Sequence, residues 1–143
     1  MQRSPGYEGQ RWLEQALADR RAGRLLEDGG SYHMACFVAQ QTAEKALKAY
    51  LYAQGEEIVV GHSVEVLCRW AAEYDPAFED LRQKVASLDG YYVPTRYPNS
   101  LPDSIPARVY TATVAKEALR LADLVLVFVQ ERMTIEGGEA GGR

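Results

Sequence analysis

The sequence predicts an all-α fold, an up-and-down bundle of about five helices, and three observations support this prediction. Apolar residues recur every three or four positions in five separate segments, which is the spacing of a helix that buries one face. Glycine, proline or an Asp-Pro step interrupts the pattern between the segments, as expected where helices end. One strand-like run, residues 58–60, has no neighbouring segment with which it would pair.

Residues 10–27 are expected to form the first helix, which ends at the Asp28-Gly29-Gly30 step. Ser31 is expected to cap a second helix that runs to about Gln54. One face of this second helix carries small residues: Ala35, Ala39, Ala43 and Ala46. Small side chains let a neighbouring helix approach closely, so we expect the last helix to pack there.

The third helix is expected to begin at His62 or Ser63 and to carry an apolar stripe from Val64 to Tyr74. Asp75-Pro76 closes it and starts a fourth helix at residues 77–88. Residues 89–102 contain three prolines and a glycine and are expected to form a long loop. Asp103 is then expected to cap a last helix that tolerates Pro106 in its first turn and ends at about Met133.

Length and charge are those of one soluble domain. The chain has 143 residues, 47% of them hydrophobic, and a formal net charge of −4. This length predicts a single domain over residues 1–143, with a core at about 10–133 and a disordered tail at 134–143. No apolar leader or bilayer-length apolar run is present, which predicts a cytoplasmic protein. The negative charge argues against a broad nucleic-acid surface.

The last helix is apolar on nearly all sides between Leu121 and Val129. A helix of this kind is buried on more than one side, so it is either central to the bundle or part of a subunit interface. We therefore expect a homodimer or a higher assembly.

Neither a metal site nor a cofactor is predicted. Cys36 and Cys68 lie far apart in the sequence, and the chain has two histidines, His33 and His62. Zinc would need ligands from all four without any local pairing, so buried, reduced thiols are expected instead. Neither histidine has a catalytic partner that sequence spacing reveals.

The loop at residues 89–102 is the first candidate site. It carries Tyr91, Tyr92, Arg96 and Tyr97 in a backbone stiffened by prolines. Arginine offers a planar fork to phosphate, and tyrosine offers a stacking face and a hydroxyl group. Alternatively, the tyrosines plug the end of the bundle while Arg96 pairs with Asp89 or with a helix carbonyl group.

A polar stripe on the second helix is the other candidate, formed by Gln41, Glu44, Lys45 and Lys48. The spacing favours a solvated face on which Glu44 and Lys48 form an i,i+4 ion pair. The lysines are alternatively a phosphate site if Arg96 folds over them. Any anion site is accordingly expected to combine Arg96 with Lys45 or Lys48.

Three runs of sequence follow one another along the chain: FVAQQTAEKALKAYLYAQG at residues 37–55, GHSVEVL from residue 61 and LDGYYVPTRYPNS from residue 88. Together they resemble the HEPN domain (higher eukaryotes and prokaryotes nucleotide-binding) in its small stand-alone prokaryotic form. The resemblance covers about residues 10–133. It implies an all-α, self-associating nucleotide- or partner-binding module, working with a minimal nucleotidyltransferase in a toxin–antitoxin-like pair.

Many HEPN relatives are metal-independent ribonucleases with an Arg-x4-6-His motif, in which the histidine serves acid/base chemistry. That motif is absent here, because Leu101, Pro102 and Asp103 stand where a histidine would follow Arg96. No arginine precedes His33 or His62 at the required distance. A divergent ribonuclease toxin is the alternative function, and whether the chain is an enzyme stays open.

Overall fold

The computed structural model describes the backbone of residues 3–141 and the side chains of residues 3–133. Within this range the chain is helical and contains no strand, so the predicted all-α class is confirmed. The helices are α1 (Pro5–Asp28), α2 (Tyr32–Ala53), α3 (Val64–Ala71), α4 (Phe78–Val85), the 3-10 helices η1 (Ala86–Tyr91) and η2 (Pro98–Ser100), α5 (Pro106–Val109) and α6 (Ala112–Gly141). Residues 142–143 lie outside the described range, and disorder of the tail stays a prediction.

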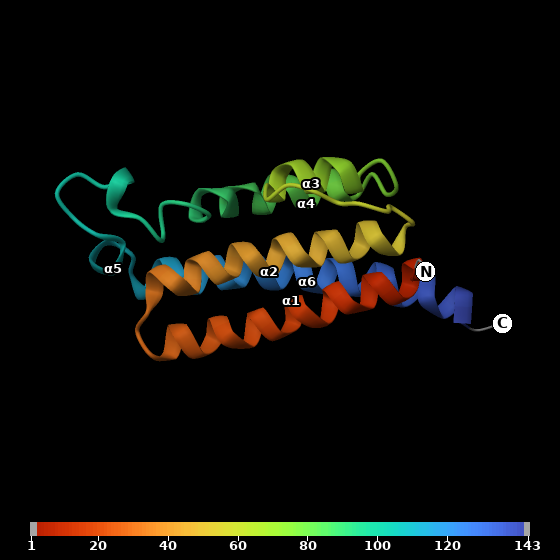
Figure 1. Cartoon of the computed structure of the whole chain (residues 1–143), viewed down its shortest axis with the longest axis horizontal. Coiled ribbons are helices and arrows are strands. Elements are labelled where there is room, and N and C mark those ends of the chain that lie inside the picture. Colours follow the sequence, from red (N-terminus) through yellow and green to blue (C-terminus); the bar gives the residue numbers. More distant parts are fainter. Residues whose placement is uncertain (1–2, 142–143) are drawn as a thin grey trace.

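The bundle is built around α2. Helices α1, α2 and α6 lie side by side (Figure 1). The shorter α3 covers another side of α2, and α4 packs on α3 and α6. Helix α2 contacts α1, α6 and α3, so α2, and not the last helix, is the central element. Helix α6 packs on α1, α2 and α4 and leaves Val127 exposed.

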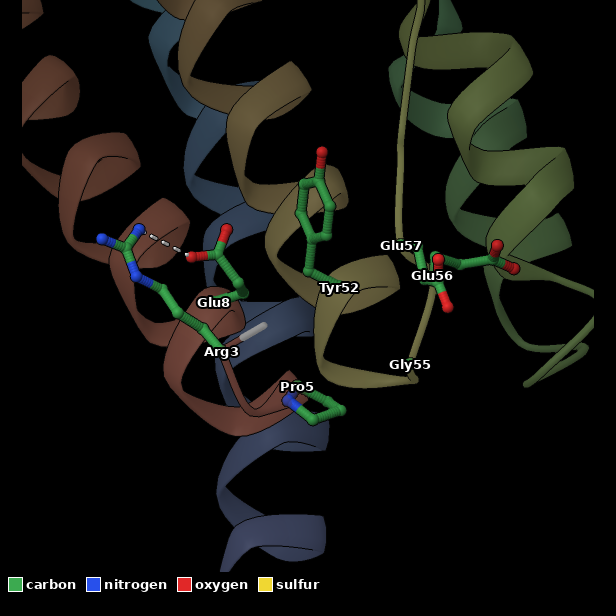
Figure 2. A pocket seen from close by; sticks show the side chains of 7 residues that line it. All are labelled: Arg3, Pro5, Glu8, Tyr52, Gly55, Glu56 and Glu57. Carbon is green, nitrogen blue, oxygen red and sulfur yellow. Dashed lines mark hydrogen bonds and ion pairs between the residues drawn. The ribbon is translucent and has the colours of Figure 1, made fainter. Parts of the chain in front are cut away.

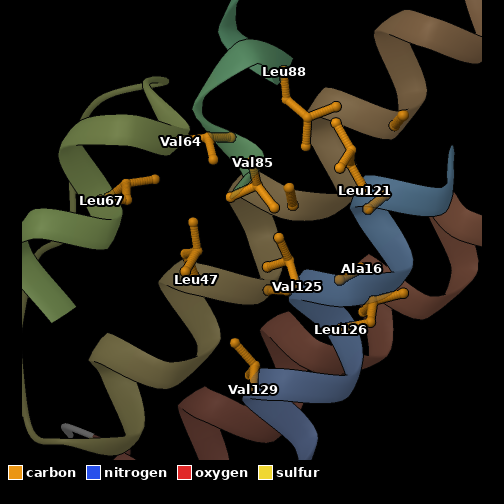
Figure 3. Packing of buried hydrophobic residues seen from close by; sticks show 14 of the residues in the cluster. Ala16, Leu47, Val64, Leu67, Val85, Leu88, Leu121, Val125, Leu126 and Val129 are labelled. Atoms are coloured by element: carbon orange, nitrogen blue, oxygen red, sulfur yellow. The ribbon is translucent and has the colours of Figure 1, made fainter. Parts of the chain in front are cut away.

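Alanines on α2 allow its neighbours to approach closely. Ala35, Ala39, Ala43, Ala46 and Ala49 are all fully buried. Opposite them, α6 contributes larger side chains, including Val125, Leu126 and Val129, to a continuous core (Figure 3). The predicted packing of the second helix against the last is confirmed, because small and large residues interdigitate along the interface.

Both cysteines belong to this core. Cys36 and Cys68 are free and fully buried, as predicted. Burial raises the pKa of each thiol to about 12, so both are protonated and unreactive at neutral pH.

The connector between α2 and α3 runs back along α2 before α3 begins (Figure 1). Val59 is buried and its N–H donates to the Tyr52 hydroxyl group at 3.1 Å, whereas Ile58 and Val60 are exposed. Glu56 accepts from Trp70 Nε1 at 3.0 Å and so ties the connector to α3. Consecutive helices therefore do not alternate in direction at this point, because an extended segment makes the return.

Helix boundaries and caps differ from the expectations at several places, and α1 begins at Pro5, before the expected residue 10. Ser63 caps α3 through the N–H of Val66, as predicted, but Ser31 occupies the N-cap of α2 without a side-chain hydrogen bond. Tyr74 lies beyond the end of α3. Helix α4 is shorter than residues 77–88, because the chain tightens into η1 after Val85.

The predicted start of the last helix is wrong. Asp103 has a φ of 54° and caps nothing, and Pro106 begins the separate short helix α5. Tyr110 is extended, with a ψ of 135°, and its ring packs edge-on against Tyr91 at 6.1 Å. This contact and the extended backbone at Tyr110 separate the two helices. Helix α6 then continues to Gly141, beyond the expected end at Met133.

Close packing at Gly9 generates a stability prediction. A Cβ atom at Gly9 would lie 2.8 Å from the Ala53 Cβ and 2.9 Å from the Ala49 carbonyl oxygen. We expect Gly9→Ala to lower the free energy of unfolding by about 1–3 kcal/mol, because the α2 backbone must move. Gly6→Ala, in the same helix, meets nothing within 4 Å and serves as the control. Urea unfolding measures both, and equal effects would contradict close packing of α1 on α2.

Asp75 generates a prediction about acid stability. Its carboxylate accepts from the Ala77 N–H at 3.0 Å and from Arg132 Nε at 2.8 Å, and these bonds lower its pKa. Since the folded pKa lies below the unfolded one, the stabilisation is present above the unfolded pKa and is lost as pH falls through the folded pKa.

We expect Asp75→Asn to cost up to about 1 kcal/mol at pH 7, and the difference from the native chain to shrink as pH falls through the folded pKa of Asp75. Unfolding measured as a function of pH from neutral to acid tests this, with Asp28→Asn on the exposed end of α1 as the control. A difference that does not shrink with falling pH would show that the negative charge of Asp75 is not responsible.

Candidate functional site

Half of the polar stripe of α2 is buried. Glu44 is 3% exposed and Lys48 is 6% exposed, so the predicted solvated face is wrong for these two residues, whereas Gln41 and Lys45 are partly exposed. Trp12 of α1 lies against Lys48, and the returning connector brings His62 to Glu44. The predicted i,i+4 ion pair is confirmed, with Lys48 Nζ 3.1 Å from Glu44 Oε2. This is a buried ion pair, which is far more sensitive to loss of a partner than a surface pair.

The Glu44 carboxylate gathers three donors. Besides Lys48 Nζ, His62 Nδ1 lies 3.1 Å from Oε2, and Gln41 Nε2 donates to Oε1 at 3.3 Å. A carboxylate only accepts, which assigns the proton to Nδ1 of the His62 ring. The His62 side chain is 59% exposed, and its Nε2 has no hydrogen-bond partner among the described residues. This nitrogen is available to an external group.

Gln40 holds the connector in this position. Its side chain is fully buried, its Nε2 donates to the His62 carbonyl oxygen at 2.6 Å, and its Oε1 accepts from Gln41 at 2.9 Å. His62 is therefore fixed twice, through its backbone and through its ring.

The His62 ring contacts the aromatic loop at residues 89–102. It stacks on Tyr92 with ring centroids 5.0 Å apart and an interplanar angle of 17°. The Arg96 guanidinium carbon lies 4.9 Å from the Tyr92 centroid, 4.3 Å from that of Phe37 and 5.4 Å from that of Tyr97. Arg96 thus occupies a site lined by three aromatic rings, an arrangement that favours a cation.

Arg96 retains hydrogen-bonding capacity. Its Nε donates to the Tyr92 carbonyl oxygen at 2.8 Å, a backbone carbonyl group just after η1, whereas the predicted alternative is a carbonyl group within a helix. The predicted alternative of a salt bridge to Asp89 is wrong. Within residues 3–133, no carboxylate forms an ion pair with Arg96.

Asp89 instead fastens the loop to α3. Its carboxylate accepts from the N–H groups of Val64 at 2.6 Å and Glu65 at 3.1 Å, and from the Ser63 hydroxyl group at 2.8 Å. These donors include the otherwise unpaired N–H groups at the start of α3. Because Ser63 follows His62 directly, this cap sets the distance between His62 and Tyr92.

The structure joins six of the eight predicted residues through His62 into one network. These are Gln41, Glu44, Lys48, Tyr92, Arg96 and Tyr97. Lys45 lies apart, in an ion pair with Asp19 of α1 at 2.5 Å. Tyr91 also lies apart, half-buried against Tyr110, and burial raises its pKa.

Sequence reasoning missed four residues of the network: Trp12, Phe37, Gln40 and His62. His62 is the residue whose position had a sequence signal. It follows Gly61, which has a φ of 101°, within one of the three HEPN-like runs. The carboxylate partner that fixes its role lies on another helix and is invisible to local spacing.

An open hollow of about 560 Å³ lies at the far end of α2 (Figure 2). Its lining includes Glu8, Glu56, Glu57 and Tyr52, and Arg3 is paired with Glu8 at 3.3 Å. The lining contains none of the phosphate-binding candidates. Across the described side chains, no group of three His, Cys, Asp or Glu residues is arranged to hold a metal ion.

Burial of the Glu44–Lys48 pair generates a stability prediction. We expect Lys48→Met to lower the free energy of unfolding by about 3 kcal/mol, because a buried carboxylate loses its cation. Lys45→Met, which breaks the more exposed pair with Asp19, is the control and should cost under about 1 kcal/mol. Chemical denaturation measures both, and equal losses would contradict the difference in burial. The double variant Glu44→Gln/Lys48→Met should recover part of the loss.

Comparison with known proteins agrees with this architecture. The HEPN domain model matches residues 10–132. No curated protein matches the chain significantly. No helix in the described part of the chain has the length and apolar character needed to cross a membrane.

Two solved structures are similar over most of the chain. TT1696 from Thermus thermophilus has 43% identity and a TM-score of 0.82, over 87% of this chain and 97% of TT1696. ST0689, an archaeal HEPN homologue, has 34% identity and a TM-score of 0.72, over 93% of this chain and 99% of ST0689. The family match and these two relatives show that the chain belongs to the HEPN family.

Proposed function

We propose that this HEPN protein is a nucleotide-binding module whose phosphate contact is Arg96. The observation that carries the proposal is the environment of the Arg96 guanidinium. This group lies among three aromatic rings and donates one of its N–H groups to a backbone carbonyl group. A planar guanidinium with remaining donors is suited to a phosphate group. Tyr97, 49% exposed, offers a stacking face for a base beside it.

The two predicted lysines are less suitable. Lys45 is neutralised by Asp19 and Lys48 by Glu44, and the Lys48 side chain is almost fully buried. Recruiting either one would break an existing ion pair. The proposal therefore assigns the phosphate to Arg96 without them, and departs here from the expectation drawn from sequence.

A protein partner is part of the proposal. Four exposed apolar side chains lie in the Arg96 loop or shortly after it in the chain, namely Val93, Tyr97, Ile105 and Val109. Exposed apolar side chains of this kind suit a protein contact. The family relationship favours a minimal nucleotidyltransferase as that partner, in a toxin–antitoxin-like pair in the cytoplasm, and a homodimer or higher assembly of the HEPN chain.

A divergent ribonuclease is the second candidate function. The observation in its favour is the His62 ring, which the buried Glu44 orients and whose Nε2 has no hydrogen-bond partner among the described residues. A histidine held in this way is suited to proton transfer. An RNA cleavage assay of the native chain and of His62→Gln separates this candidate from a module that only binds.

Arg96→Ala is expected to weaken binding of AMP about tenfold or more, because one charge-assisted hydrogen bond contributes about 1.5–3 kcal/mol. Isothermal titration calorimetry measures the affinity, and circular dichroism verifies that the fold is kept. Lys45→Ala is the matched control, and its affinity should stay within about twofold of the native value. Unchanged AMP binding by Arg96→Ala would contradict the proposed phosphate contact.

A further inference from the structure

His62 and Arg96 are neighbours of the same ring, although they come from different segments. Both lie within about 5 Å of the Tyr92 ring centre, His62 at 5.0 Å and Arg96 at 4.9 Å. Each has a nitrogen that forms no hydrogen bond with any described residue, Nε2 of His62 and the terminal guanidinium nitrogens of Arg96. The centre of the His62 ring and the guanidinium carbon of Arg96 therefore lie no more than about 10 Å apart, so one nucleotide can reach both.

The charge of this site depends on one proton. Glu44 and Lys48 cancel each other, which leaves the single positive charge of Arg96 when the His62 ring is neutral. A protonated His62 ring adds a second positive charge. Tyr92 stacks on the ring, Gln41 donates to the same Glu44 carboxylate, and Asp89 is occupied in capping α3.

We propose that His62 is the second phosphate-contacting group and binds in its protonated form, so that the preferred ligand is a nucleotide with a terminal phosphate. This inference rests on the proposed nucleotide-binding function. The inference adds the chemical class of the ligand, a nucleotide with a terminal phosphate, and the proton that His62 carries when this ligand is bound.

The hydrogen-bond geometry requires the proton. When Nδ1–H donates to Glu44 in a neutral ring, Nε2 carries a lone pair and can only accept a hydrogen bond. This lone pair repels the lone pairs of a phosphate oxygen. The protonated ring donates from Nε2 to the phosphate and from Nδ1 to the buried carboxylate. The aromatic face of Tyr92 also stabilises a cation stacked on it.

The charge balance selects the terminal phosphate. A phosphomonoester carries about −1.5 to −2 at neutral pH, because its second pKa is about 6. Arg96 and a protonated His62 match this charge. An internal phosphodiester has a single negative charge, which Arg96 alone balances.

The experiment compares AMP, cyclic AMP and adenosine as ligands of the full chain in calorimetry near pH 8. AMP has a terminal phosphate, cyclic AMP has a phosphodiester and adenosine has no phosphate. We expect AMP to bind about tenfold more tightly than cyclic AMP. The AMP titration is repeated in two buffers with different enthalpies of ionisation, and we expect net proton uptake when AMP binds.

His62→Gln tests the residue directly. Glutamine is uncharged, so this variant should bind AMP about tenfold more weakly, with affinity equal in both buffers and no proton uptake. His33→Gln, which replaces the histidine in the first turn of α2, is the matched control and should behave as the native chain. The buffer comparison on the native chain keeps the test valid even if His62→Gln is destabilised.

Two contrary results are distinguishable. AMP binding that depends on Arg96 but takes up no proton and does not change in His62→Gln would overturn this inference and leave the proposed function intact. Absence of binding by all three ligands would overturn the proposed function and this inference with it.

Discussion

Burial of the Glu44 carboxylate in the middle of α2 is the constraint on which the arrangement of the site depends. A charge removed from water is tolerated only when donors surround it. Lys48 supplies one donor from the next turn, and Gln41 supplies another from the preceding turn. The third donor is His62, which the chain delivers by running back along α2 after the helix has ended.

The path of the connector follows from this requirement. Gln40 holds the His62 backbone while Glu44 holds the ring, so the extended segment is pinned at two points against α2. Helix α3 begins immediately afterwards, and Asp89 of the loop caps it. Tyr92 is thereby stacked on His62, and Arg96 lies over the Tyr92 ring, although both come about thirty residues later in the chain.

Apolar packing between α1 and α2 also shapes this site. Gly9, Gly23 and the alanines of α2 keep the long helices close, so that Trp12 of α1 reaches across to lie over Lys48 at 5.6 Å. The Lys48 cation is enclosed by an aromatic ring and a carboxylate and is not available to solvent ligands. Within this network Arg96 therefore becomes the cation that the fold leaves accessible, and the loop that carries it becomes the part of the molecule suited to recognition.

Local sequence by itself determined the helical class, the alanine face of α2, the Glu44–Lys48 pair and the irregular aromatic loop. These features depend on spacings of three and four residues or on proline and glycine, which act within a few residues. Tertiary structure alone decided that Glu44 and Lys48 are buried, that α5 separates from α6 at Tyr110, and that His62 joins Glu44 to Tyr92. The physical reason is that burial and donor pairing depend on which distant segments pack against a helix face. Residue spacing along one helix does not identify those segments.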